Sequence, residues 1–206
     1  MMAQKTGTAE VLAGGAWFRR LALVLSTVVA AMLLASGVAL AANVACVAGA
    51  SQCLGTGKND AITGTDNLAG DVIDARAGDD VVKAADGSDT VLGRAGDDEL
   101  HGDGVGDAAN DQGDSLQGGG GADELWGDNG DDALVGGGGP DIIHADFGDT
   151  LQERGFETAF GGRGNDTIRA ADGLEDHIGC GDGTDEVYYD AQKDVVGADC
   201  EIKHAL

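Results

Sequence analysis

Residues 118–144 read GGGGADELWGDNGDDALVGGGGPDIIH, three consecutive copies of a nine-residue unit, GGxGxDxUx, in which U is a bulky apolar residue. The middle copy has lost one glycine. A third intact copy, GGRGNDTIR, spans 161–169. Partial copies are ARAGDDVVK at 75–83, GRAGDDELH at 93–101 and CGDGTDEVY at 180–188. A short fixed period predicts a solenoid, because each unit can bury its apolar residue only against its neighbours.

The register of the repeat extends beyond the glycines. One column holds the apolar residues Ile73, Val82, Val91, Leu100, Leu116, Leu125, Leu134, Ile143, Ile168, Ile178, Val187 and Val196. A second column, two positions earlier, holds Asp71, Asp80, Asp89, Asp98, Asp114, Asp123, Asp132, Asp141, Asp166, Asp176, Asp185 and Asp194. The spacing widens twice, so residues 102–113 and 145–160 are either degenerate repeats or loops.

Each part of the unit has a physical role. Its glycines allow positive φ, so the chain can turn tightly and carbonyl oxygens can converge. Its aspartate supplies a hard oxygen ligand, and calcium takes six to eight oxygens. The last three residues form a short strand whose central apolar side chain points inward. The unit therefore predicts a calcium-binding turn followed by a strand.

The composition agrees with bound cations. The chain has 206 residues, 37 of them glycine, and 37 acidic residues against 12 basic ones give a net charge of −25. Charge of this sign argues against nucleic acid and anionic membrane surfaces as partners. Unneutralised carboxylates at this density would oppose a compact state.

Residues 1–41 differ from the rest of the chain. Arg19 and Arg20 precede an apolar stretch, 21–40, which ends in the small-x-small pattern Ala39-Leu40-Ala41. These features predict a cleaved secretory signal peptide and a secreted protein with no membrane contact after cleavage. The alternative is an uncleaved membrane anchor, because the stretch is nearly long enough to span a bilayer.

Four cysteines, Cys46, Cys53, Cys180 and Cys200, lie beyond this leader. An even number in an exported chain predicts disulfides, and three pairings are possible. Local pairing is favoured because each pair brackets one end of the array, although a zinc site is a rival. We thus expect an N-terminal cap at 42–54, the repeats at 55–188 and a C-terminal cap at 189–206.

The nonapeptides resemble the RTX, or haemolysin-type calcium-binding repeat, family. The resemblance implies an all-β fold, a right-handed parallel β-roll (β-solenoid) with two nonapeptides per turn and several calcium ions in rows along both edges. It also supports pairing of Cys180 with Cys200. The ligands that it implies are carboxylates and glycine carbonyls, at Asp60, Asp71, Asp80, Asp89, Asp98, Asp114, Gly119, Gly121, Asp123, Gly130, Asp132, Gly137, Gly139, Asp141, Gly162, Gly164, Asp166, Asp176 and Asp185.

Catalysis is not expected. The chain has no GxSxG, HExxH or P-loop motif, and its carboxylates share one repeated environment, whereas acid–base pairs need unlike environments. His101, His144 and His177 are expected to be isolated surface residues. The sequence therefore predicts a secreted, non-enzymatic protein that folds on calcium. The alternative is a cell-surface or matrix adhesin whose outer faces bind a glycan or protein.

Overall fold

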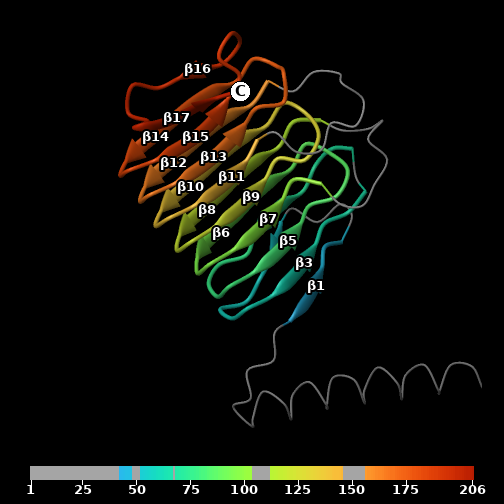
Figure 1. The fold of residues 1–206 in the computed structure, drawn as a ribbon. Coiled ribbons are helices and arrows are strands. Elements are labelled where there is room, and N and C mark those ends of the chain that lie inside the picture. The colour runs from blue at the N-terminus through green and yellow to red at the C-terminus, as the bar shows by residue number, and fades with distance from the viewer. Residues whose placement is uncertain (1–41, 48–51, 67, 104–111, 146–155) are drawn as a thin grey trace, which may run out of the picture. The chain divides into compact units, whose positions relative to one another are not determined.

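The computed structural model describes residues 42–47, 52–66, 68–103, 112–145 and 156–206. The predicted leader at 1–41 lies outside the described residues. All regular structure in the described part is β-strand (Figure 1). No helix in this part is long and apolar enough to span a membrane.

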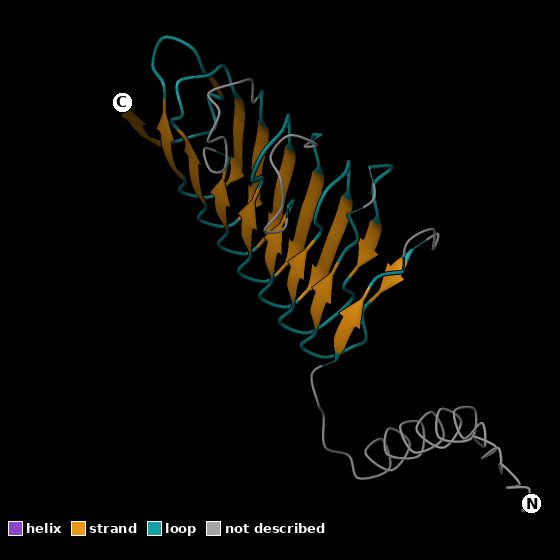
Figure 2. Ribbon diagram, turned by 90° about the vertical axis from the view of Figure 1, so that its right-hand side faces the viewer, coloured by secondary structure: helices purple, strands orange, loops and turns teal. Residues whose placement is uncertain are grey.

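The strands form two parallel sheets that face each other (Figures 1 and 2). The nine-stranded sheet contains, in spatial order, β1 (Asn43–Ala45), β3 (Ala61–Thr63), β5 (Val81–Lys83), β7 (Glu99–His101), β9 (Glu124–Trp126), β11 (Ile142–His144), β13 (Thr167–Ala170), β15 (Glu186–Tyr189) and β17 (Ile202–Ala205). The eight-stranded sheet contains β2 (Cys53–Leu54), β4 (Val72–Asp74), β6 (Thr90–Ala95), β8 (Ser115–Gly120), β10 (Ala133–Gly138), β12 (Thr158–Arg163), β14 (His177–Asp182) and β16 (Val195–Val196).

Consecutive strands alternate between the sheets, so two nonapeptides make one turn. Leu125 pairs with Ile143, and the intervening Leu134 pairs with Leu116 in the other sheet. Such spacing follows from the repeat, because each coil places its apolar residue directly above the same residue of the coil before it. The predicted β-roll with two nonapeptides per turn is confirmed.

The core is a narrow double column between the sheets. All the apolar residues of the predicted column are buried except Val196, which is partly buried in the last coil. Two further members, Ile62 and Ala159, each 1% exposed, extend the column beyond the residues that the period identified. Because no position is far from solvent, the fold depends on stacking and on its turns.

The widened spacings do not interrupt the sheets. Ala133 pairs with Thr158 and Val91 with Leu116, as in regular coils. The extra residues lie in the connections from β7 to β8 and from β11 to β12, both of which lead from the nine-stranded to the eight-stranded sheet. Residues 156–160 therefore belong to a degenerate repeat that precedes the intact copy at 161–169.

Two disulfides join the predicted local pairs. Cys46 bonds to Cys53 across the first coil, with their Cα atoms 5.3 Å apart. Cys180 bonds to Cys200 near the other end, with their Cα atoms 5.1 Å apart. The local pairing is confirmed. The expected cap residues 43–45 and 53–54 lie in β1 and β2, the first strands of the two sheets.

Candidate calcium-binding edges

The turns between strands lie along two edges of the roll (Figure 2). Edge I is made of the turns that lead from the eight-stranded to the nine-stranded sheet, and edge II of the turns in the opposite direction. Edge I carries Asp60, Asp80, Asp98, Asp123, Asp141, Asp166 and Asp185. Edge II carries Asp71, Asp89, Asp114, Asp132, Glu157, Asp176 and Asp194.

The edge carboxylates form ladders along the roll. In edge I the amide of Asp98 donates to Oδ1 of Asp123 at 3.0 Å, and the amide of Asp123 donates to Oδ1 of Asp141 at 2.9 Å. Edge II repeats the pattern, since the amide of Asp114 donates to Oδ1 of Asp132 at 2.8 Å. One oxygen of each carboxylate thus ties its turn to the preceding coil, and the other oxygen is left for another partner.

That second oxygen is buried and accepts no hydrogen bond in a consecutive series of edge I residues. A buried carboxylate oxygen without a donor or counter-charge is costly, so a row of such atoms indicates a binding site for cations. These edge I residues are Asp80, Asp98, Asp123, Asp141, Asp166 and Asp185. On edge II, Oδ2 of Asp114 is likewise buried and accepts no hydrogen bond.

The raised pKa values of the edge carboxyl groups also indicate a cation-binding site. Burial, with a smaller contribution from neighbouring carboxylates, raises the pKa of Asp80 to about 6, of Asp98 and Asp141 to about 7, and of Asp114 to about 9. Burial also raises the pKa of Asp123. A cation beside these carboxyl groups would lower each pKa, because an opposite charge favours the ionised form.

Glycine at the first repeat position makes room for the carboxylate. A methyl group on Gly118 would collide with Oδ2 of Asp123 and lie 2.7 Å from the carbonyl oxygen of Gly136 in the next coil. The same arrangement joins Gly136, Asp141 and the Gly161 carbonyl, at 2.7 Å, and Gly161, Asp166 and the Cys180 carbonyl, at 2.6 Å. Each cradle therefore combines a carboxylate of one coil with a carbonyl of the next.

The other predicted glycines shape the turns. Positive φ is found at Gly119, Gly121, Gly130, Gly137, Gly139, Gly162 and Gly164. Arg94, which pairs with Gly119 in the adjacent coil, keeps a φ of 85°. A left-handed conformation that persists where glycine is lost shows that the stacked turns impose it, at a cost of about 1–3 kcal/mol for a non-glycine residue.

The available ligands suit calcium. Within the part of the chain that the structure describes, no three Asp, Glu, His or Cys side chains converge on one point. An ion at these edges would therefore take main-chain carbonyls together with a carboxylate, the all-oxygen coordination that calcium prefers. The cradles and their unpaired oxygens fit such an ion.

Two predicted ligands are already hydrogen-bonded. The carboxylate of Asp60 accepts from Thr56, and that of Asp71 accepts from Thr65. Their neighbours in the ladders, such as Asp80 and Asp89, have no such threonine within their own turns.

Sequence reasoning missed Glu157. It is 4% exposed, occupies the aspartate position of edge II, and its amide donates to Oδ1 of Asp176 at 3.0 Å. Burial, and then the adjacent Asp176, raise the pKa of Glu157. The register, in which Thr158 pairs with Ala133, identifies Glu157 as the replacement. The only signal in the sequence is its place two residues before Ala159.

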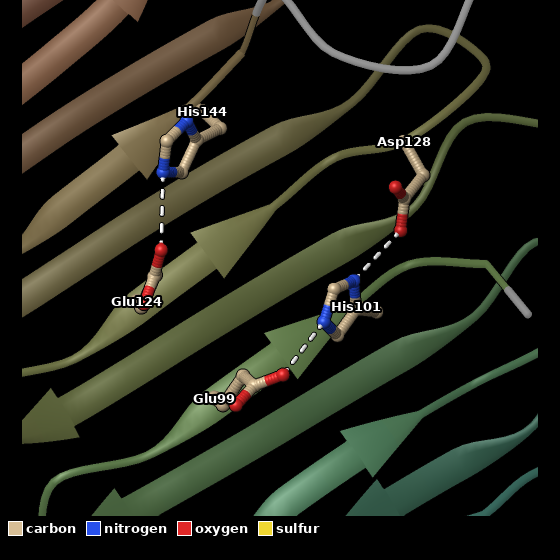
Figure 3. Close-up of polar contacts among 5 residues, drawn as sticks. All are labelled: Glu99, His101, Glu124, Asp128 and His144. Atoms are coloured by element: carbon tan, nitrogen blue, oxygen red, sulfur yellow. Dashed lines mark hydrogen bonds and ion pairs between the residues drawn. The ribbon is translucent and has the colours of Figure 1, made fainter.

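The histidines on the nine-stranded sheet are not isolated, contrary to the prediction. Trp126 stacks on His101 and on His144, with ring centroids 5.7 and 3.6 Å apart. His101 contacts Asp128 and Glu99 at 3.3 and 3.2 Å, and His144 contacts Glu124 at 3.3 Å (Figure 3). Stacking of coils brings these residues together. Trp126 therefore stacks against a histidine of the coil on either side.

The partners of His101 also change its protonation. Its hydrogen bond to Asp128, and a second to Glu99, raise its pKa. His177, the third histidine, meets Phe156 edge to face, with ring centroids 4.8 Å apart.

Comparison with known families identifies the repeats. The family of the RTX calcium-binding nonapeptide repeat (4 copies) matches residues 54–91, 65–100, 74–108, 108–143 and 153–173. Comparisons with curated proteins and with solved structures found no match. The matched segments together span more than half of the chain. The chain therefore belongs to the RTX calcium-binding nonapeptide repeat family.

Proposed function

We propose that this protein is a secreted, non-enzymatic calcium-binding β-roll that folds when calcium binds along its edges. The observation that carries the proposal is the row of buried edge I carboxylates whose second oxygens accept no hydrogen bond. Four of them, Asp98, Asp123, Asp141 and Asp166, lie in cradles completed by a carbonyl of the next coil, as at Asp123 and Gly136. An ion placed there joins two coils and neutralises charge.

Calcium can supply the free energy that the core lacks. Acidic residues outnumber basic ones by 37 to 12, and such charge opposes a compact chain. A ligand that binds only the folded state adds about 2.7 kcal/mol for each site at about 100 times its Kd. Several such sites together exceed the net stability of many small domains.

Calcium titration tests the proposal. Far-ultraviolet circular dichroism and Trp126 emission are followed on residues 42–206 as calcium is added to chelated protein. We expect both signals to change together, because the Trp126 ring is covered by side chains from the coils on either side. Magnesium serves as the control, since it is smaller and demands near-octahedral geometry. A β spectrum and compact size that persist in chelator would overturn calcium-dependent folding.

Export rests on separate observations. The Arg19-Arg20 pair, the apolar stretch 21–40 and the Ala39-Leu40-Ala41 pattern support a signal peptide, and two disulfides suit an oxidising compartment. The intact mass of the exported protein should correspond to a chain that begins at Ala42. Recovery of the full-length chain in membranes would favour an anchor instead.

The absence of enzymatic activity is proposed from the arrangement of the described residues beyond the leader. These residues lie in the strands and turns of one roll, and the buried acids of its inner coils repeat a similar environment from coil to coil. Acid–base catalysis needs neighbouring groups with unlike environments.

A further inference from the structure

The first carboxylate on each edge differs from those of the inner coils in what it contacts. Oδ2 of Asp60 accepts a hydrogen bond from the amide of Thr56 at 2.5 Å, and Oδ1 accepts from the Thr56 hydroxyl at 3.0 Å. On edge II, Oδ2 of Asp71 accepts from the Thr65 amide at 2.6 Å and from its hydroxyl at 2.9 Å. Both edges therefore begin with a carboxylate that a threonine of the same turn already holds.

The threonines occupy a specific repeat position. Thr56 follows Gly55 and Thr65 follows Gly64, so each stands second in its unit, where the intact copies have Gly119, Gly137 or Gly162. Glycine has no hydroxyl to donate, and Oδ2 of Asp123 also lacks the amide donor that Thr56 supplies to Oδ2 of Asp60. The rest of the ladder is unchanged, because the amide of Asp60 donates to Oδ1 of Asp80 at 2.7 Å.

The carboxylate of Asp60 has a third hydrogen-bond donor. The amide of Ala42 lies 3.1 Å from its Oδ1, where inner coils place the amide of the preceding aspartate. If export removes residues 1–41, this nitrogen becomes the charged α-amino group of the mature chain. A cationic donor on the carboxylate strengthens the hydrogen bond and supplies the charge that an ion would otherwise bring.

The opposite end of edge II is closed in a similar way. Oδ1 of Asp194 accepts from the amide of Asp176 at 3.1 Å, and Oδ2 accepts from the amide of Asp190 at 2.6 Å. The turn that carries Asp194 leads into β16, the last strand of its sheet, so a cation there would lack the ligands of a following coil.

We propose that Thr56 and Thr65 take the place of a cation at the first carboxylate of each edge, so that Asp60 and Asp71 bind no calcium. The inference rests on the proposed calcium binding and states which edge carboxylates take no part in it. The ion row of edge I then begins at Asp80, and the residues before it form a cap that protein hydrogen bonds and the Cys46–Cys53 disulfide hold together.

Calcium stoichiometry provides the first test. Asp60→Asn, Asp71→Asn and the matched control Asp123→Asn are dialysed against calcium, and bound calcium per chain is measured by elemental analysis. We expect Asp123→Asn to bind at least one ion fewer than the unaltered chain, and Asp60→Asn and Asp71→Asn to bind as many. A loss in Asp60→Asn equal to that in Asp123→Asn would overturn the inference. If Asp123→Asn loses none, the proposed function fails instead.

A thermal measurement covers variants that fold poorly. The slope of Tm against the logarithm of calcium concentration reports the ions released on unfolding. Thr56→Val keeps Asp60 but removes the hydroxyl, so we expect Tm to fall by about 2–4 °C at every calcium concentration, with an unchanged slope. Thr56→Ser retains the hydroxyl and should restore Tm. An unchanged Tm in Thr56→Val, or a lower slope, would contradict the inference.

Discussion

At the scale of single residues, glycine has two separate roles in the turns. Gly119 adopts a φ of 121°, which most side chains resist, whereas Gly118 is needed because a carboxylate and a carbonyl occupy the space of its missing side chain. Gly120 has neither constraint, since a methyl group there would lie 3.8 Å from its nearest neighbour, the Gly138 carbonyl. Three adjacent glycines therefore differ in how much substitution should cost.

Alanine substitutions can test this difference. Gly118→Ala should weaken calcium binding and lower the free energy of unfolding by about 1–3 kcal/mol, the usual cost of overpacking. Gly120→Ala, the matched control, should stay within about 0.5 kcal/mol of the unaltered chain. Denaturant unfolding at fixed calcium gives both values. Equal costs at the two positions would show that the Gly118 cradle has no special role.

At the scale of elements, the parallel register determines which turns interact. Asp123 and Asp141 belong to neighbouring turns of edge I and are joined by a hydrogen bond of 2.9 Å. Asp132 lies between them in sequence but on edge II, where its Oδ1 accepts from Asp114. Coupling should therefore follow the edge and not the distance along the chain.

A pair of double-mutant cycles measures that coupling. Asp123→Ala and Asp141→Ala damage shared ligands, so their effects on calcium-dependent stability should be non-additive by about 0.5–3 kcal/mol. Asp123→Ala with Asp132→Ala, the control pair, should come closer to additivity. Stronger coupling in the control pair would contradict the assignment of the two edges.

At the scale of the whole molecule, the buried edge carboxylates make the metal-free fold sensitive to pH. Their pKa values in the folded state, about 6 for Asp80 and about 7 for Asp98 and Asp141, exceed the value of about 3.9 in an unfolded chain. The folded state thus binds more protons between these values. Its stability is greatest below the unfolded pKa and is lost as pH rises through the folded pKa.

Acidification should therefore partly replace calcium. In chelator, lowering the pH from about 8 to about 5 should increase the β signal and the compactness of the chain, measured by circular dichroism and size-exclusion chromatography. At saturating calcium the same change should weaken calcium binding, because protons and calcium compete for the carboxylates. A metal-free spectrum that is constant over this range would rule out the proton linkage.

Much of the architecture follows from the sequence, because a nine-residue period repeats both the turn and the inward residue. Leu125 and Leu134 could be assigned to the core and Asp123 to a turn from spacing alone. The pairing of Cys46 with Cys53 was favoured because the two cysteines bracket one end of the repeats. These features are local or periodic, so the order of residues along the chain contains them.

Tertiary structure decided the rest, because it sets which coils stack across the irregular connections. It placed Glu157 in the edge II ladder and Ala159 in the core. It brought His101 and His144 to the two faces of Trp126. It also placed the three intact repeats, GGGGAD, GGGGPD and GGRGND, on edge I. The physical reason is that the partner of a side chain in a solenoid lies one coil away, and a period of nine does not reveal how many residues that coil contains.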